Sequence, residues 1–571
     1  MGLIPPCYRD QGSPTRYDKA LTSDQRIDYD VLTPGNHELY VSEITYEHFY
    51  NFSRRYGDRY VSSNVQVLNP ATSEFEYMGV THRYFTTDHG LRVMAFGVLF
   101  NFTGNSNASR VIPAGEMVKQ QWFQDALTCD EAVDLYLLIG HNPARPTVPS
   151  STFATVYDAI RAKKPDTPIQ IFGGHNHIRD FAVYDDKTTA LGSGRYCETL
   201  GWLSMSGIES DTYNGTDKPK GVPNPTTKAI KANATADGNA TYTAPTNSSG
   251  LTYSRRYLDW NRITFEYHAT GSQIKSFDTI RGLNTTQDIY DIRQDLNLTK
   301  LYGCAPQTWC VNCVPFLSEG SIYSLLQKAV STVIVNQSRA DNSRILIQNT
   351  GSVRFDLPKG PFTFDDSFIV SPFQNAFQYI PDVPYELAGQ IIGILNNGSF
   401  FSKRSLETSD FGFYNPSLEL AGDDCVDLGV FHDHSTQKRS LGKVIRRQNT
   451  DTHPGYVTKD DFGDDGDDTV HTPIPFYTNP QYFSANGTFP TDGQDPENVD
   501  LIFIDFVQKD VLTVLSDLGA SYTTADVSNY LPKTYTTNTY LSLYAQTAED
   551  WQADIPDCPV GLGIGYNETS S

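Results

Sequence analysis

Residues 135–141 read LYLLIGH, and residues 169–177 read IQIFGGHNH. Each stretch begins as a short apolar run, turns at glycine and reaches histidine, which is typical of a buried strand whose end carries polar side chains. The same kind of pattern predicts further strands at 30–33 and 93–99, and helices at 19–27, 118–127 and 154–163. Helices that alternate with buried strands predict a layered α/β domain.

A third motif of the same kind, Gly35-Asn36-His37-Glu38, follows the expected strand at 30–33. In an open α/β sheet the strand ends at one edge form the ligand crevice, so the three motifs can converge there. A single Gly-His pair is more often an ordinary loop than a metal ligand, and His-x-His alone favours neither. Three such motifs in order, in a chain with only 12 histidines, favour a metal site. Its candidate residues are Asn36, His37, His141, His175 and His177.

The order Gly-Asn-His-Glu, Gly-His and Gly-His-x-His resembles the calcineurin-like metallophosphoesterases. Residues 29–38 and 193–196 are similar to fungal members of the 5′-nucleotidase branch of that family. The resemblance implies an α/β fold, a layered metallophosphatase β-sandwich flanked by helices. It also implies two divalent metal ions (Zn, Mn, Fe or Mg) that activate a bridging water and clamp the phosphate.

The resemblance assigns a role to each candidate residue. Asn36, His141 and His175 would bind one metal ion, and His177 would bind the other. His37 would not be a ligand. It would act on the leaving oxygen of the phosphate ester as a catalytic acid or electrostatic partner.

The family pattern contains two further motifs, Asp-x-His and Gly-Asp, ahead of Gly-Asn-His-Glu. Neither stands upstream of Gly35 in this chain. Residues 1–10 also lack the charged and apolar parts of a signal peptide. One explanation covers both observations: the chain is truncated at its N-terminus, so the metallophosphatase domain is expected to be incomplete. The alternative is a true pseudoenzyme.

A second resemblance lies downstream, in residues 349–354 (NTGSVR) and 372–375 (PFQN). Both are similar to segments of the 5′-nucleotidase C-terminal domain, which implies an α+β domain whose arginine holds phosphate or ribose and whose phenylalanine stacks on the nucleobase. A guanidinium matches phosphate oxygens, and a stacked base contributes about 1–3 kcal/mol. Arg354 as a surface ion-pair residue and Phe373 as a core residue remain alternatives. The candidate substrate-binding residues are Asn349, Gly351, Arg354, Phe373 and Asn375.

We expect two domains, a phosphoesterase domain at 1–300 with a loop insertion at 208–250, and a C-terminal domain at 301–571. Patterns after residue 260 predict strands at 263–267 and 345–347 and helices at 321–333 and 510–518, and a folded pattern returns at 499–506. Residues 402–475 hold three dibasic pairs and an acidic run without the twelfth-position Glu of a calcium loop. We expect a flexible insertion there.

Cysteines and glycosylation motifs indicate the compartment. Thirteen Asn-x-Ser/Thr sites stand where the 32 asparagines would give about five by chance. Three of the eight cysteines cluster at 304–313, and without a second pair at zinc spacing we expect disulfides rather than a zinc knuckle or redox motif. We therefore expect a glycoprotein that is secreted or vacuolar. The sites are Asn51, Asn101, Asn107, Asn214, Asn233, Asn239, Asn247, Asn284, Asn297, Asn336, Asn397, Asn486 and Asn567.

Taken together, the sequence predicts a metal-dependent hydrolase of phosphate monoesters, with nucleotides as the expected substrate class. The net charge of -23 argues against a nucleic acid partner, and no apolar run reaches the length of a membrane span. A non-catalytic secreted glycoprotein is the alternative from another class. A phosphodiesterase or a sugar-phosphate phosphatase on the same scaffold is the alternative enzyme.

Overall fold

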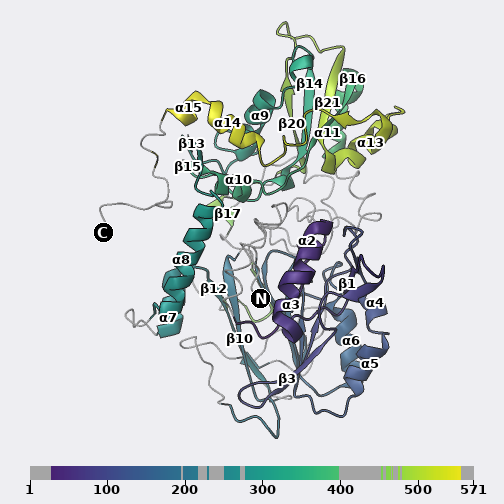
Figure 1. Ribbon diagram of the computed structural model, residues 1–571, viewed down its shortest axis with the longest axis vertical. Helices are drawn as coiled ribbons and strands as arrows, with labels where there is room; N and C mark the ends of the chain where they lie inside the picture. The colour runs from purple at the N-terminus through teal and green to yellow at the C-terminus, as the bar shows by residue number, and fades with distance from the viewer. Residues whose placement is uncertain are drawn as a thin grey trace.

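The computed structural model describes most of the chain, in two halves that lie one above the other in Figure 1. The described residues are 28–194, 197–215, 228–229, 250–270, 277–397, 452–453, 458–463, 466, 474–475, 477, 479–553 and 558. The helix expected at 19–27 and most of the insertions at 208–250 and 402–475 lie outside them.

A seven-stranded sheet forms the centre of the first half, in the order β18-β8-β9-β7-β6-β4-β3. Its middle strands β4, β6, β7 and β9 run parallel. Their sequences are apolar and mostly buried, as is typical of parallel strands that are covered on both faces. The seven strands are β3 (Arg83–Thr86), β4 (Arg92–Gly97), β6 (Leu135–Ile139), β7 (Ile169–Gly173), β8 (Arg179–Asp185), β9 (Thr188–Ser193) and β18 (Thr458–Asp460).

Three helices pack on this sheet: α4 (Ala114–Met117), α5 (Gln121–Thr128) and α6 (Phe153–Lys163). Phe123 and Phe153 join the strands in one buried cluster. The strands expected at 93–99, 135–139 and 169–172 and the helices expected at 118–127 and 154–163 are confirmed within a few residues. At 30–33 the structure has only an isolated bridge between Leu32 and Tyr60 instead of a strand.

A second layer holds the loop that carries Asn36 and His37. Residues 36–38 form the 3-10 turn η2 (Asn36–Glu38), which leads into α2 (Ser42–Glu47), η3 (His48–Ser53), α3 (Arg54–Tyr56) and η4 (Gly57–Arg59). Beside them lies a three-stranded sheet of β1 (Val65–Leu68), β2 (Phe75–Tyr77) and β5 (Ser109–Val111). Another small sheet pairs β10 (Thr199–Ser206), β12 (Thr252–Asp259) and β11 (Lys228–Ala229). The layered α/β expectation is confirmed.

Residues 263–267 form part of helix α7 (Arg262–Thr270), so the strand expected there is wrong. The side chain of Asn261 accepts a hydrogen bond from the backbone N–H of Thr264 at 2.9 Å, which begins the helix. Ile263 is 82% exposed, so the apolar alternation that suggested a strand does not mark a buried face. Helix α8 (Ile280–Asp295) follows and runs along the side of the molecule towards the second half (Figure 1).

The second half is built on a five-stranded sheet in the order β20-β14-β21-β16-β22. Its strands are β14 (Arg344–Asn349), β16 (Phe377–Pro384), β20 (Tyr482–Gly487), β21 (Asn498–Ile504) and β22 (Ser528–Asn529). Helices pack around it: α9 (Ile322–Val333), α10 (Phe364–Val370), α11 (Tyr385–Leu395), α13 (Gln508–Asp517), α14 (Tyr540–Thr547) and α15 (Glu549–Gln552). The strands and helices expected after residue 320 are confirmed, and the half is α+β as expected.

Short elements complete the second half. β13 (Leu301–Ala305) pairs with β15 (Gly360–Thr363), and β17 (Thr452–His453) pairs with β19 (Ile474–Pro475). The 3-10 turns are η6 (Gln337–Arg339), η7 (Thr350–Ser352), η12 (Asp505–Val507) and η13 (Thr524–Asp526).

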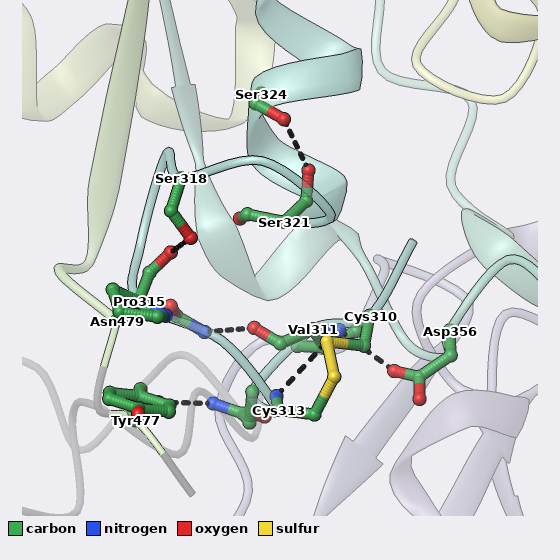
Figure 2. Close-up of a disulfide and its surroundings, with 11 residues drawn as sticks. Cys310, Val311, Cys313, Pro315, Ser318, Ser321, Ser324, Asp356, Tyr477 and Asn479 are labelled. Atoms are coloured by element: carbon green, nitrogen blue, oxygen red, sulfur yellow. Dashed lines mark hydrogen bonds between the residues drawn. A yellow bond between two sulfur atoms is a disulfide. The ribbon is translucent and has the colours of Figure 1, made fainter. Parts of the chain in front are cut away.

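Two disulfides confirm the disulfide expectation for four of the eight cysteines: Cys304–Cys558 and Cys310–Cys313. Figure 2 shows the second one closing a tight turn, in which the backbone N–H of Cys313 approaches Cys310 Sγ at 3.2 Å. Asn479 donates to the carbonyl of Val311 at 2.9 Å, so this turn holds the chain where it returns from the insertion. Cys129 is a free thiol.

Residues 458–463 of the insertion, which we call the returning segment, are ordered and packed, unlike the flexible insertion expected over 402–475. Strand β18 pairs in parallel with β8 at the edge of the central sheet. Asp460 binds Arg255 at 2.8 Å, and Phe462 packs 4.7 Å from the ring of Phe181. Because Arg255 is fully buried, the acidic residues that suggested a solvated loop instead neutralise a charge in the interior.

Candidate metal and phosphate site

Two histidines meet at the carboxyl ends of β6 and β7. These strands are parallel neighbours with Ile139 opposite Phe172, so the turns that follow them lie side by side. Gly174 N–H donates to the carbonyl of Asn142 at 2.9 Å, which ties one turn to the other. His141 Nε2 and His175 Nδ1 are consequently 3.3 Å apart.

This separation fits two ligands of a single metal ion. In a tetrahedral site with Zn–N bonds of about 2.0–2.1 Å, two ligand nitrogens are about 3.3–3.4 Å apart. Burial lowers the pKa of His141 to about 4 and that of His175 well below its usual value, with the neighbouring histidines lowering both further. Both imidazoles are therefore neutral near pH 7, and neutral imidazole is the form that binds metals.

The loop with Asn36 and His37 lies against His141. A Cβ on Gly35 would be only 3.4 Å from His141 Nδ1, so no side chain separates this loop from the imidazole. Asn36 is buried, and its Nδ2 donates to Tyr40 at 2.9 Å. A metal at this position would therefore meet the amide oxygen Oδ1. Among the described residues no three His, Cys, Asp or Glu side chains gather as a metal site.

His37 belongs to the same cluster, because its charge lowers the pKa of both His141 and His175. The structure thus brings together His37, His141, His175 and the Asn36 loop. His177 lies two residues beyond His175 on the same turn, and its role as the second metal's ligand stays a prediction.

The turn that carries His175 and His177 has an unusual backbone. Both residues have positive φ, 72° and 58° respectively, a region that costs a non-glycine residue about 1–3 kcal/mol. Such strain persists only where the surrounding structure holds it, and it is common at ligand sites.

Phe100 also belongs to the site, although it was not among the candidates predicted from the sequence. Its ring stacks on His175 with a centroid distance of 4.1 Å, and its N–H donates to the carbonyl of His141 at 3.2 Å. This ring covers one face of the histidine pair. Phe100 follows the end of β4, the strand beside β6, so its position after a buried strand was the signal that could have identified it.

The substrate-binding candidates of the second half lie on two neighbouring loops. Asn349 ends β14, and Gly351 lies in η7. The N–H of Arg354 donates to the carbonyl of Val370 at 2.9 Å, which brings the two loops together.

The Arg354 guanidinium carbon is 4.9 Å from the centre of the Phe373 ring, and only 5% of Phe373 is exposed. Asn375 donates to Asp505 at 2.8 Å. Arg354 and Phe373 are therefore together, and the roles of all five candidates stay predictions.

Comparison with known families gives two matches on this chain. Residues 10–179 match the model of the calcineurin-like phosphoesterases. Residues 308–512 match the model of the NAD nucleotidase C-terminal domain.

Three similar proteins cover most of the chain. A protein of Arthroderma benhamiae named "Secreted protein" is 49% identical over 537 residues, which span 93% of this chain and 79% of that protein. An uncharacterised protein of Schizosaccharomyces pombe is 36% identical over 508 residues, 88% of this chain and 75% of its own length. The crystal structure of a 5′-nucleotidase from Candida albicans aligns with a TM-score of 0.71 at 32% identity, covering 92% of this chain and 85% of that one.

Proposed function

The chain belongs to the calcineurin-like phosphoesterases of the 5′-nucleotidase type. We propose that it hydrolyses nucleoside monophosphates at a centre of two divalent metal ions. The family makes it a hydrolase of phosphate monoesters. The observation that carries the proposal is the 3.3 Å contact between the half-buried His141 and His175, both of which have a lowered pKa. Bound metal ions would polarise the phosphate and lower the pKa of an attacking water.

The chain's own residues would then perform distinct tasks. His141, His175 and the Asn36 amide hold one ion, and His177 contributes to the other. His37 contributes to the lowered pKa of both metal-binding histidines, and we assign it the donation of a proton to the leaving oxygen. Phe100 excludes water from one side of His175.

Histidine substitutions test the metal site. His141→Ala or His175→Ala in the full-length protein should lose bound metal together with turnover, because each removes a ligand. His37→Ala should keep its metal. Its turnover should fall by about 100-fold or more, as expected for the loss of a general acid. Metal content is measured by elemental analysis and turnover with p-nitrophenyl phosphate.

His82→Ala is the matched control, because His82 stacks on Trp122, 5.7 Å away, outside the cluster that holds His37. Metal retained by both the His141 and the His175 variant would contradict the proposed ligands.

A nucleotide is the preferred substrate class because both the C-terminal family match and the Candida albicans 5′-nucleotidase support it. Arg354 would hold phosphate or ribose, and Phe373 would stack on the base. Phe373→Ala should then raise KM for a nucleoside monophosphate about 5- to 150-fold, as expected for a stacking contribution of about 1–3 kcal/mol, and leave KM for p-nitrophenyl phosphate unchanged.

An equal effect on both substrates would assign Phe373 to the core instead. Phe362→Ala is the control for the loss of a buried ring, because Phe362 is another buried phenylalanine of the same half. If the protein hydrolysed a sugar phosphate or a phosphodiester as fast as a nucleoside monophosphate, the alternative enzyme classes would be favoured.

We place the protein in the secretory pathway, as a secreted or vacuolar glycoprotein. The two disulfides and the relative named "Secreted protein" support this.

No helix in the described part of the chain is long and apolar enough to cross a membrane. Asn336 is half-buried, and the other eight sequon asparagines in the described ranges are exposed: Asn51, Asn101, Asn107, Asn214, Asn284, Asn297, Asn397 and Asn486. Glycosidase treatment of native protein should lower its mass by several glycans, and an unchanged mass would oppose this location.

A further inference from the structure

The returning segment reaches the loop that carries His141. Asp461 Oδ1 accepts a hydrogen bond from Arg145 at 2.8 Å, and its Oδ2 accepts from the backbone N–H of Val183 at 2.8 Å. The side chain of Asp461 is 7% exposed and that of Arg145 is 9% exposed. This contact therefore joins a residue that follows α11 of the second half to the sheet of the first half in a dry environment.

Arg145 also binds Asp180, with distances of 2.7 Å from Nη2 and 3.2 Å from Nε. Arg145 follows His141 by four residues, and Asp180 follows His177 by three. The ion pair consequently connects the two turns that carry the histidines. Asp461 and Asp180 bind different nitrogens of the guanidinium, so together they fix its plane as well as its position.

The chain between Arg145 and His141 is tightly held. The Tyr184 hydroxyl donates to the carbonyl of Ala144 at 2.9 Å, and the carbonyl of Asn142 accepts from Gly174. The Asn142 side chain exchanges hydrogen bonds with Thr152. These hydrogen bonds fix the segment from His141 to Arg145 at several points, so the position of the guanidinium affects the position of the His141 turn.

We propose that Asp461 is a positioning residue for the metal site, which fixes the His141 turn through Arg145. The inference rests on the proposed metal-binding role of His141 and His175. Groups that hydrogen-bond a metal ligand directly typically contribute about 10- to 100-fold in metal affinity. Asp461 acts one step further away, through Arg145 and the chain that follows His141, so we expect a contribution at the lower end of that range. The long insertion of the second half thereby takes part in assembling the active site of the first.

Metal affinity measures this role without reference to turnover. The dissociation constant for Zn²⁺ is determined by competition with a chromophoric chelator, for the full-length chain and its Asp461→Ala variant. We expect Asp461→Ala to bind Zn²⁺ about 10-fold more weakly. Asp461→Asn should give a smaller loss, because one amide oxygen can accept from Arg145 or from Val183 but its Nδ2 cannot accept from the other.

Asp460→Ala is the matched control. Asp460 belongs to the same segment and neutralises another buried arginine, Arg255, but it does not touch Arg145. Both alanine variants leave a buried arginine short of a partner, so both should unfold at lower urea concentration. Only the Asp461 variant should lose Zn²⁺ affinity. The Asp461→Asn variant keeps the comparison informative if Asp461→Ala does not fold.

Two outcomes would overturn the proposal: unchanged Zn²⁺ affinity in both Asp461 variants, or an equal loss in Asp460→Ala. His141→Ala separates this failure from that of the metal site itself. If His141→Ala loses Zn²⁺ while the Asp461 variants keep it, only the positioning role is wrong. If His141→Ala binds Zn²⁺ as tightly as the parent chain, the metal site and the inference are both wrong.

Discussion

Gly173 lies where the turn after β6 presses against the end of β7. A Cβ at this position would be 2.7 Å from the backbone nitrogen of Ala144 and 2.8 Å from the carbonyl oxygen of Asn142. Both are backbone atoms of the loop that follows His141, so they cannot rotate away as a side chain would. The absence of a side chain at Gly173 is therefore part of what lets His141 and His175 come within 3.3 Å.

Gly173→Ala should damage the site more than the fold. Overpacking of this kind costs about 1–3 kcal/mol of stability, and the displaced loop would carry His141 away from His175. We expect weaker Zn²⁺ binding together with a modest fall in the urea midpoint. Gly115→Ala is the control, because nothing lies within 4 Å of a Cβ there. Wild-type Zn²⁺ affinity in the Gly173 variant would show that the loops tolerate the extra methyl group.

At the scale of residues, the sequence predicted the histidines and missed the groups that hold them. His141 and His175 follow apolar strands and glycines, and that local pattern is sufficient to place them at one sheet edge. Phe100 also follows a buried strand, β4, but an apolar ring at such a position is typical of a core residue, and Asp461 has no such pattern. Each acts through a contact that only the folded chain creates, and Asp461 is separated from Arg145 by 316 residues.

Among helices and strands, the prediction from sequence was correct where the apolar side chains of the pattern are buried in the folded chain. Strands β6 and β7 are buried in the parallel core, so their sequences predicted them well. Residues 263–267 show the opposite case, because exposed apolar side chains imitate the alternation of a strand while capping by Asn261 begins a helix.

The returning segment shows a second limit at this scale. Its acidic sequence is typical of a solvated loop, and the arginines that it neutralises lie in other parts of the chain. Strand β18 also covers the edge of β8, which would otherwise present unpaired backbone groups. The partners of both the charges and the backbone are distant in sequence, so local pattern could not reveal this docking.

At the scale of the whole molecule, the chain connects its parts through long-range links of different kinds. The returning segment joins the insertion to the first half, while the Cys304–Cys558 disulfide joins the start of the second half to a residue 254 positions later. Neither link follows from the sequence, because the pairing of eight cysteines cannot be deduced from their spacing. The resemblances in the sequence predicted two halves. They did not predict how the insertion and the C-terminal residues attach to them.

The two disulfides should differ in their contribution to stability, because they close loops of very different length. In the chain-entropy account, a cross-link between Cys304 and Cys558 restrains the unfolded chain by about 5 kcal/mol, and the four-residue loop of Cys310–Cys313 by about 2 kcal/mol. Cys558→Ser should therefore lower the melting temperature considerably more than Cys313→Ser, measured by calorimetry on the oxidised proteins. Both variants lose one sulfur pair, so each controls for the other. Equal losses would mean that local contacts around the sulfurs, such as the turn that holds Asn479, outweigh the restraint on the unfolded chain.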